Sequence, residues 1–246
     1  MNILHLSDLH FGTKEDADRW YTQLEEDLSK HLKCNSLDAL VISGDIASNS
    51  VSQEYEAAKE FIINLMIDFR LRWSGVVIVP GNHDLNTNLS NDAYQPVKRK
   101  DYHGLENDSR IFDNKEGDYI EVLDPEKYKQ RFTYFRAFYN TFLKKPYSLE
   151  PEWQYTLHHF PNHDLLILGL NSAWQLDYYY KFRVSINPDA LSHAMAEIDN
   201  NPTYKKSRLK IAVWHHPLDS SFKDRITDHN FLEQLAQNGL DRKSVV

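Results

Sequence analysis

The sequence contains a single cysteine, Cys34, among its 246 residues. A disulfide framework within the chain is therefore excluded, and the composition is compatible with a reducing compartment. No basic segment followed by an apolar stretch stands at the N-terminus, and no apolar run approaches membrane-spanning length. These absences lead us to expect a cytoplasmic protein that has no membrane partner.

Basic residues are also in short supply. The chain carries 28 Lys and Arg residues against 36 Asp and Glu residues, which gives a formal net charge of −8. A non-specific nucleic-acid binder usually carries a basic face, so the balance does not favour a nucleic-acid partner. It does not exclude a nuclease, because bound metal ions can supply local positive charge.

Short apolar runs alternate with helix-length segments in the first part of the chain. The runs are Ile3–Leu6, Ala39–Ser43 and Val76–Val79, and they are apolar on nearly every residue. Such runs are typical of strands covered on both faces. Helices expected at Asp16–His31 and Ser52–Phe69 separate them, so the pattern predicts an α/β fold with a parallel sheet and right-handed crossovers.

Residues 85–150 are polar and show little strand signal, which predicts an insertion or cap within a domain spanning residues 1–240. Its clearest expected element is one helix over Pro125–Leu143, whose aromatic stripe either docks on the core or covers the site. The strand and helix patterns then resume. We expect a hairpin from Trp153–Phe160 and Leu165–Leu170, a strand over Leu209–Trp214, and helices over Pro188–Ile198 and Phe231–Gln237.

Polar clusters follow four of the predicted strands. They are Asp8-Leu9-His10, Gly44-Asp45, Gly81-Asn82-His83-Asp84 and His215-His216-Pro217. Open α/β sheets place their ligands at the carboxyl ends of strands. Taken singly, each cluster is ordinary turn or capping chemistry. Together they offer oxygen and nitrogen donors that suit Mn, Fe or Zn better than Ca, so the joint pattern indicates a metal centre.

The spacing of these residues suggests how they act. Residues two apart in a strand point the same way, so Asp8 and His10 are expected to bind one ion. Asp45 has two carboxylate oxygens and is the natural bridge between two ions. Two metals roughly 3.5–4 Å apart clamp a phosphate and lower the pKa of a bridging water from about 15.7 towards about 7. Gly44 and Gly81 would let the backbone turn tightly beside the site.

The four clusters, in this order, resemble four of the five motif blocks of the calcineurin-like metallophosphoesterases, and the resemblance covers most of the chain outside the insertion. It implies a four-layer α/β/β/α sandwich of two mixed sheets flanked by helices. It also implies a binuclear centre of two divalent or trivalent ions, most naturally Mn, Fe or Zn. The implied ligands are Asp8, His10 and Asp45 for the first ion, and Asp45, Asn82 and His215 for the second.

The resemblance also implies roles for the neighbouring residues. His83 would lie near the leaving-group oxygen as a proton donor or phosphate-stabilising group, and Asp84 would orient its neighbours or meet the substrate. His215 is chosen as the ligand because similar family members carry it two residues before the proline. His216 would then face the substrate.

The fifth family block, a Gly-His-x-His loop that gives one histidine to each metal, is absent from the sequence. Residues 241–246 can be encoded by a common sequencing-adapter sequence, so we expect either a possible non-native tail or a natural truncation. A native stop codon after Val246 in source DNA would exclude the adapter. Each ion would keep three protein ligands, so we expect poor metal binding and weak or absent activity of this chain. Two tight sites in a metal titration would contradict this.

The leading functional hypothesis is a metal-dependent hydrolase of phosphoester bonds, and more narrowly a phosphodiesterase that acts on a small phosphoester through a metal-activated water. A DNA exonuclease of the double-strand-break repair type is the main alternative, because it shares the Asp-x-His-x-Gly start seen from Asp8 to Gly12. The acidic balance and the His-His-Pro block favour the diesterase. A protein Ser/Thr phosphatase is disfavoured, since no Arg closely follows Gly44-Asp45 and Asp84 stands where those enzymes carry Glu. A non-catalytic scaffold on the same fold usually lacks the catalytic histidine, whereas His83 is present.

Overall fold

The computed structural model describes residues 1–104, 110–113, 117–220 and 223–240. The segment 241–246, for which a non-native tail is expected, lies outside the described residues. No helix in the part of the chain that is described has both the length and the apolar character to cross a membrane.

The first sheet consists of three parallel strands in the order β1-β2-β3. They are β1 (Ile3–Leu6), β2 (Ala39–Ser43) and β3 (Val76–Val79). Every residue of β2 and β3 is buried, which explains why these strands are apolar on consecutive positions instead of alternating. The sequence prediction of a parallel sheet is confirmed for these strands.

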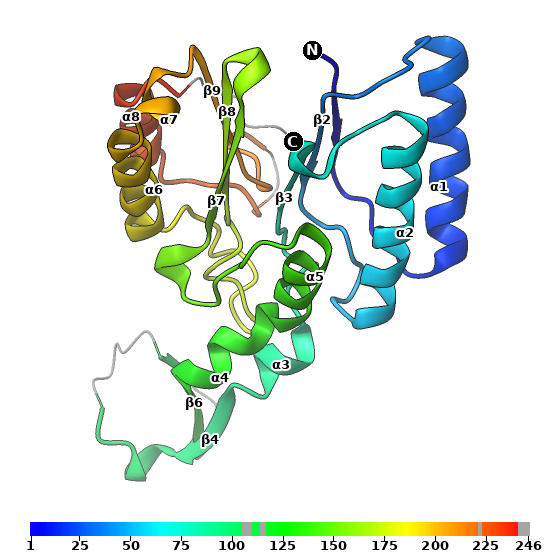
Figure 1. Ribbon diagram of the computed structural model, residues 1–246. Coiled ribbons are helices and arrows are strands. Elements are labelled where there is room, and N and C mark those ends of the chain that lie inside the picture. The colour runs from blue at the N-terminus through cyan, green and yellow to red at the C-terminus, as the bar shows by residue number, and fades with distance from the viewer. Residues whose placement is uncertain (105–109, 114–116, 221–222, 241–246) are drawn as a thin grey trace.

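Two long helices cover one face of this sheet (Figure 1). The first, α1 (Lys14–Glu26), continues into a wider turn over Asp27–His31, and the second is α2 (Ser52–Asp68). The start of α1 is fixed by Thr13, whose hydroxyl accepts a hydrogen bond from the Asp16 backbone N–H. The Asp16 carboxylate in turn accepts one from the Thr13 N–H.

The second sheet is mixed and has the order β7-β8-β9. Its strands are β7 (Tyr155–Phe160), β8 (Leu165–Leu170) and β9 (Leu209–Val213). The antiparallel pairing of β7 with β8 confirms the predicted hairpin, while β8 and β9 run parallel. On the outer side of this sheet lie the helices α6 (Pro188–Asn200), α7 (Pro202–Lys206) and α8 (Asn230–Gln237) (Figure 1).

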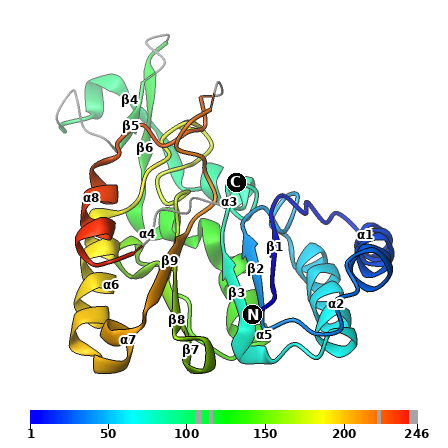
Figure 2. The same cartoon turned by 90° about the horizontal axis from the view of Figure 1, so that it is seen from above.

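The two sheets pack face to face through apolar side chains. Val41 and Val79 of the first sheet belong to the same buried cluster as Ile167 and Val213 of the second. Larger clusters fill the spaces between each sheet and its helices. Figure 2 shows the resulting layers of helix, sheet, sheet and helix, which confirms the α/β sandwich predicted from the sequence.

The segment between β3 and β7 contains strands that the sequence prediction missed. They form a small antiparallel sheet in the order β4-β6-β5. The elements of this segment are α3 (Thr87–Asn91), β4 (Tyr94–Lys98), β5 (Ile111–Phe112), β6 (Tyr119–Leu123), α4 (Pro125–Lys129) and α5 (Thr133–Leu143). Pro96 lies on β4 at the edge of this sheet, where a missing N–H is tolerated.

The single helix expected over Pro125–Leu143 is broken into α4 and α5 by a 3₁₀ turn at Gln130–Phe132. This turn brings both Arg131 and Phe132 into the interior. The aromatic residues of α5 pack into the core beside α2, where Phe138 stacks on Tyr55 at a ring-centroid distance of 5.0 Å. Other short 3₁₀ turns lie at Trp73–Gly75, Arg99–Asp101, Pro151–Trp153 and Pro161–His163.

Candidate metal centre

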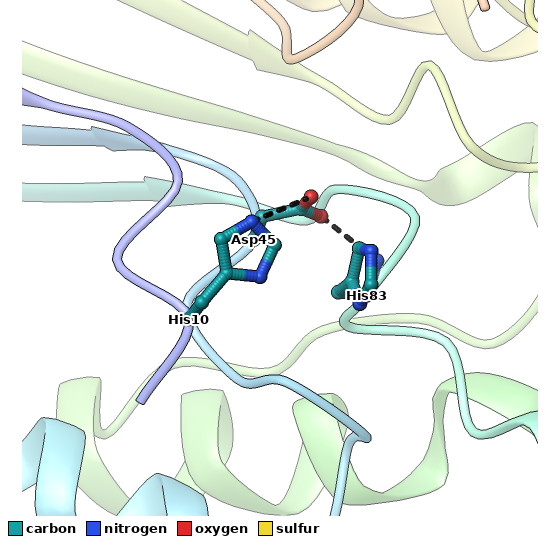
Figure 3. A group of neighbouring side chains, drawn as sticks. All are labelled: His10, Asp45 and His83. Carbon is teal, nitrogen blue, oxygen red and sulfur yellow. Dashed lines mark hydrogen bonds and ion pairs between the residues drawn. The ribbon is translucent and has the colours of Figure 1, made fainter. Parts of the chain in front are cut away.

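The loops that follow β1, β2, β3 and β9 meet at one edge of the two sheets. Asp8 and His10 follow β1, Asp45 follows β2, His83 follows β3, and His215 follows β9. Figure 3 shows His10 and His83 on either side of Asp45. The structure therefore brings together potential ligands that lie as far apart in the sequence as Asp8 and His215.

The local geometry of the first cluster differs from the one expected. Strand β1 ends at Leu6, so Asp8 and His10 lie in a loop and not at alternate positions of a strand. Both have left-handed backbone conformations, with φ of 56° and 47°, and Asp45 shares this feature with φ of 53°. Non-glycine residues in this region are strained, and such residues gather at functional sites.

Asp45 is the centre of the cluster. Its side chain is almost fully buried, and its Oδ2 lies 3.4 Å from His215 Nε2 and 3.7 Å from His10 Nε2. Its Oδ1 accepts a hydrogen bond of 2.8 Å from the backbone N–H of His83. Burial alone would raise the pKa of Asp45, but the hydrogen bonds and charges of His215 and His83 hold it below its usual value.

The potential ligand atoms form two groups that share Asp45. One group is His10, Asp45 and His83, and the other is Asp8, Asp45 and His215. Within each group the ligand atoms lie within 4.8 Å of one another. A carboxylate with two oxygens is suited to this shared position, because it can contribute to two ions at once.

His215 is oriented as a metal ligand would be. Its Nδ1 donates to the backbone carbonyl of Ser43 at 2.8 Å, which leaves Nε2 directed at Asp45. Such a second partner on a histidine ring fixes both the tautomer and the ring orientation. Burial works to lower the pKa of His215, but the hydrogen bond and charge of Asp45 outweigh it and raise the pKa to about 9.

Two glycines leave the room that this arrangement needs. Gly44 has φ of 97°, and a Cβ there would lie 2.7 Å from the His215 ring. A Cβ on Gly81 would overlap Asp45 Oδ1. Gly44 is therefore required for both conformation and space, whereas Gly81 is required for space alone.

Asp84 lies beneath the site and not in it. Its carboxylate is completely buried and accepts hydrogen bonds from the backbone N–H of Gly81 at 2.9 Å, the N–H of Ala47 at 3.3 Å and the Tyr55 hydroxyl at 3.0 Å. Burial, followed by the charge of Asp45, raises its pKa to about 6. Asp84 thus ties the loop after β2 to the loop after β3, and of its two expected roles this placement favours orienting the neighbouring residues.

His216 also lies inside the protein, which differs from the expectation that it faces substrate. Only 2% of its surface is exposed, and its Nδ1 is 2.8 Å from the hydroxyl of Ser172. Burial, followed by the charge of His215, lowers its pKa to about 3. The bend at the end of β9 directs His215 into the cluster and His216 into the core.

His83 and Asn82 border a cavity of about 240 Å³ beside the cluster. The His83 Nδ1 donates to the Ser48 carbonyl at 2.8 Å, and among the described residues its Nε2 makes no hydrogen bond. A second part of the lining comes from the segment after β8 and includes Leu176, Tyr178 and Lys181. Sequence reasoning missed this wall, because its residues form no recognisable motif.

The shared carboxylate, the oriented histidines and the adjoining cavity together form a candidate metal centre of the kind that metal-dependent hydrolases use. A family model described as calcineurin-like phosphoesterase matches residues 1–242, and the chain belongs to this family. Membership of this family supports metal-dependent phosphoesterase activity and the use of divalent metals. A comparison with curated proteins gives no match.

Proposed function

We propose that the protein is a phosphodiesterase that acts on a small phosphoester through a binuclear metal centre and a metal-activated water. The observation that supports this most strongly is the position of Asp45 in both groups of potential ligands. The family resemblance implies Asp8, His10 and Asp45 as ligands of one ion, and Asp45, Asn82 and His215 as ligands of the other. The two groups in the structure share Asp45 with these sets, but they place Asp8 with His215 and His10 with His83. Ions held there would supply Lewis acidity, which neutralises phosphate charge and makes water a stronger acid.

Three features of the chain fit such ions: the orientation of His215, the space left by two glycines, and the chemistry of the donor groups. His215 presents Nε2 because Nδ1 is already committed to Ser43, and the space around Asp45 exists only because Gly44 and Gly81 lack side chains. In addition, the donors are carboxylate and imidazole groups, which suit Mn, Fe and Zn.

His83 is proposed to hold a proton for the leaving-group oxygen. Its backbone N–H is fixed by Asp45 and its Nδ1 by the Ser48 carbonyl. The backbone and one ring nitrogen are therefore held in place, and Nε2 is left for a group bound in the cavity. A general acid must be positioned in this way to act in the transition state.

An assay with three substrates tests the proposal. Bis-p-nitrophenyl phosphate, a cyclic nucleotide and linear DNA would be incubated with Mn²⁺ and either the 246-residue chain or the gene product read from source DNA. We expect hydrolysis of a small diester by the source-gene product. Asp45→Asn should reduce that rate at least about 100-fold, because even partners outside the ligand set change activity by 10–100-fold.

The control variant Asp18→Asn removes an exposed carboxylate on α1 and should retain full activity. Cleavage of DNA with no hydrolysis of either small diester would favour the exonuclease alternative. No hydrolysis of any substrate by the source-gene product would contradict the proposal and favour a scaffold.

A further inference from the structure

We propose that Lys181 binds a second anionic group of the substrate, so that the preferred leaving group carries a carboxylate or phosphate of its own. The assignment of this anionic group to the leaving group rests on the proposed function, in which His83 donates a proton to the leaving-group oxygen. The binding of an anion by Lys181 can be measured without any turnover.

The cavity beside the metal centre has two walls. Ser48, Asn82 and His83, from the loops after β2 and β3, form the wall next to the cluster, and Leu176, Tyr178 and Lys181, from the segment after β8, contribute to the second wall. Of the proposed ligands, Asp8, His10, Asp45 and His215 are not part of its described lining, whereas Asn82 lines it beside His83. A group that fills the cavity therefore extends from the His83 side, which is the side of the leaving group.

The second wall is held in place by hydrogen bonds to Asp177. One carboxylate oxygen, Oδ1, accepts the backbone N–H groups of Tyr179 at 2.8 Å and Tyr180 at 2.7 Å. The other oxygen, Oδ2, accepts the Tyr94 hydroxyl at 2.8 Å. The backbone N–H of Tyr178 donates to Ser90 at 2.8 Å. The turn that carries Tyr178 and Lys181 is thus anchored to β4 and α3.

Arg131 connects this wall to the one that carries His83. Its buried guanidinium donates to the carbonyl of Leu176 at 3.0 Å and also to the carbonyl of Trp174. Its own carbonyl accepts the backbone N–H of Asn86 at 2.8 Å, two residues after Asp84. The spacing of the two walls is therefore fixed before any ligand arrives, which reduces the ordering that binding requires.

Lys181 is a basic residue that lines the cavity and has no acidic or hydrogen-bonding partner among the described residues. In the described part of the chain its ammonium group makes no hydrogen bond or ion pair, and Asp177, the acidic residue of the lining, is already satisfied by three donors. Leu85 and Leu176, which also line the cavity, are largely buried, and Tyr178 is 43% exposed. A cation above such a partly apolar surface suits a carbon skeleton that bears an anionic group.

Binding of leaving-group analogues tests the inference directly. Isothermal titration calorimetry on the chain, without metal, would compare 3-hydroxybenzoate and 3-hydroxyphenyl phosphate with the neutral 3-hydroxybenzamide. We expect at least one anion to bind about tenfold more tightly than the amide. This is the gain in affinity that one hydrogen bond between Lys181 and a charged group would give. Lys181→Met should abolish this preference, and Lys181→Arg should retain it.

Lys206→Met is the matched control, because it removes one exposed positive charge at the last residue of α7. It should leave the preference unchanged. The inference is overturned if both anions bind no better than the amide, or if Lys206→Met weakens the anions as much as Lys181→Met does. The tighter of the two anions identifies the group that the site prefers.

Turnover supplies a second, separate result. The source-gene product would be assayed with the methyl 3-carboxyphenyl and methyl 3-carbamoylphenyl esters of phosphate. Lys181→Met should raise KM for the carboxylate ester about tenfold with little change in kcat, because the contact exists before and during reaction. Absence of turnover with both esters contradicts the proposed function, whereas the calorimetry alone decides the role of Lys181.

Discussion

At the scale of single residues, the protonation of His215 links metal binding to pH. Its pKa of about 9 means that, without metal, the ring is positively charged at neutral pH and paired with Asp45. A histidine must lose that proton to act as a ligand. We therefore expect Mn²⁺ binding near pH 7 to release about one proton from this side chain.

Calorimetric Mn²⁺ titrations in buffers of different ionisation enthalpy measure that release. His215→Gln should bind metal more weakly and release correspondingly fewer protons. An observed binding enthalpy that is independent of the buffer would show that His215 keeps its proton and is not a ligand.

The role of His83 can be separated from that of the ligands. His83→Ala should lower kcat of the source-gene product by about 10²–10⁴-fold, the usual contribution of a positioned general acid. Because His83 also lies in one group of potential ligands, metal affinity must be measured in parallel. Equal losses of affinity and rate would place His83 among the ligands instead.

At this scale, the sequence identified the candidate ligands but not how deeply the neighbouring residues are buried. The polar blocks after the strands supplied Asp8, His10, Asp45 and His215, which the structure brings together. The burial of Asp84 and His216 was not readable from the blocks. It depends on which way the chain bends after β3 and β9, and this is decided by tertiary contacts with Tyr55 and Ser172.

At the scale of elements, strand β7 carries a buried histidine between the two sheets. His158 is 2% exposed, and neither ring nitrogen has a hydrogen-bond partner within the part of the protein that is described. Burial, followed by the charge of Lys145, lowers its pKa to about 3. The unfolded chain therefore binds this proton at a higher pH than the folded protein does.

The consequence is an acid-sensitive contribution to stability. As pH falls from about 6.5 towards 3, His158 should destabilise the fold by up to about 1.4 kcal/mol per pH unit. Chemical denaturation of the protein and of His158→Leu across this range tests it. The difference between their unfolding free energies should shrink or reverse in favour of the variant at low pH. A difference that does not change with pH would contradict the account.

Arg131 gives a second prediction at this scale. Its donors hold Trp174 and Leu176, so Arg131→Met leaves buried carbonyls without partners, each worth about 1–3 kcal/mol. We expect a loss of stability of that order, together with faster amide exchange in the segment after β8. Unchanged exchange there would exclude the role of Arg131 as a connection between the two walls.

The success of element prediction followed the strength of the local pattern. Buried apolar runs gave β2, β3 and β8, and helical spacing gave α2 and α6. Strands β4 and β6 were missed because Tyr94–Lys98 mixes polar residues with Pro96, and its pairing partner lies more than twenty residues away. The break between α4 and α5 was missed because it depends on the burial of Arg131, a residue that normally favours helix.

At the scale of the whole molecule, the sandwich places four loops at one edge, and for the loops after β1, β2 and β3 this follows from parallel strand order. The carboxyl ends of β1, β2 and β3 lie side by side, so the meeting of their loops can be inferred from the strand order alone. The approach of β9 from the second sheet could not be derived from spacing alone. It was expected only from the resemblance to the family, and the cavity wall after β8 was not expected at all.

The acidic character of the whole chain bears on its partners. With a formal net charge of −8, we expect weak and strongly salt-dependent binding to duplex DNA. Fluorescence anisotropy with a labelled duplex in the absence of metal measures this. Tight binding at physiological salt would favour the exonuclease alternative over the diesterase.

The most direct test of the central claim is a crystal structure grown at saturating Mn²⁺, with anomalous diffraction used to locate the ions. The account predicts two anomalous peaks roughly 3.5–4 Å apart, with the Asp45 carboxylate between them. Peaks elsewhere in the molecule, or a single peak that does not contact Asp45, would contradict it.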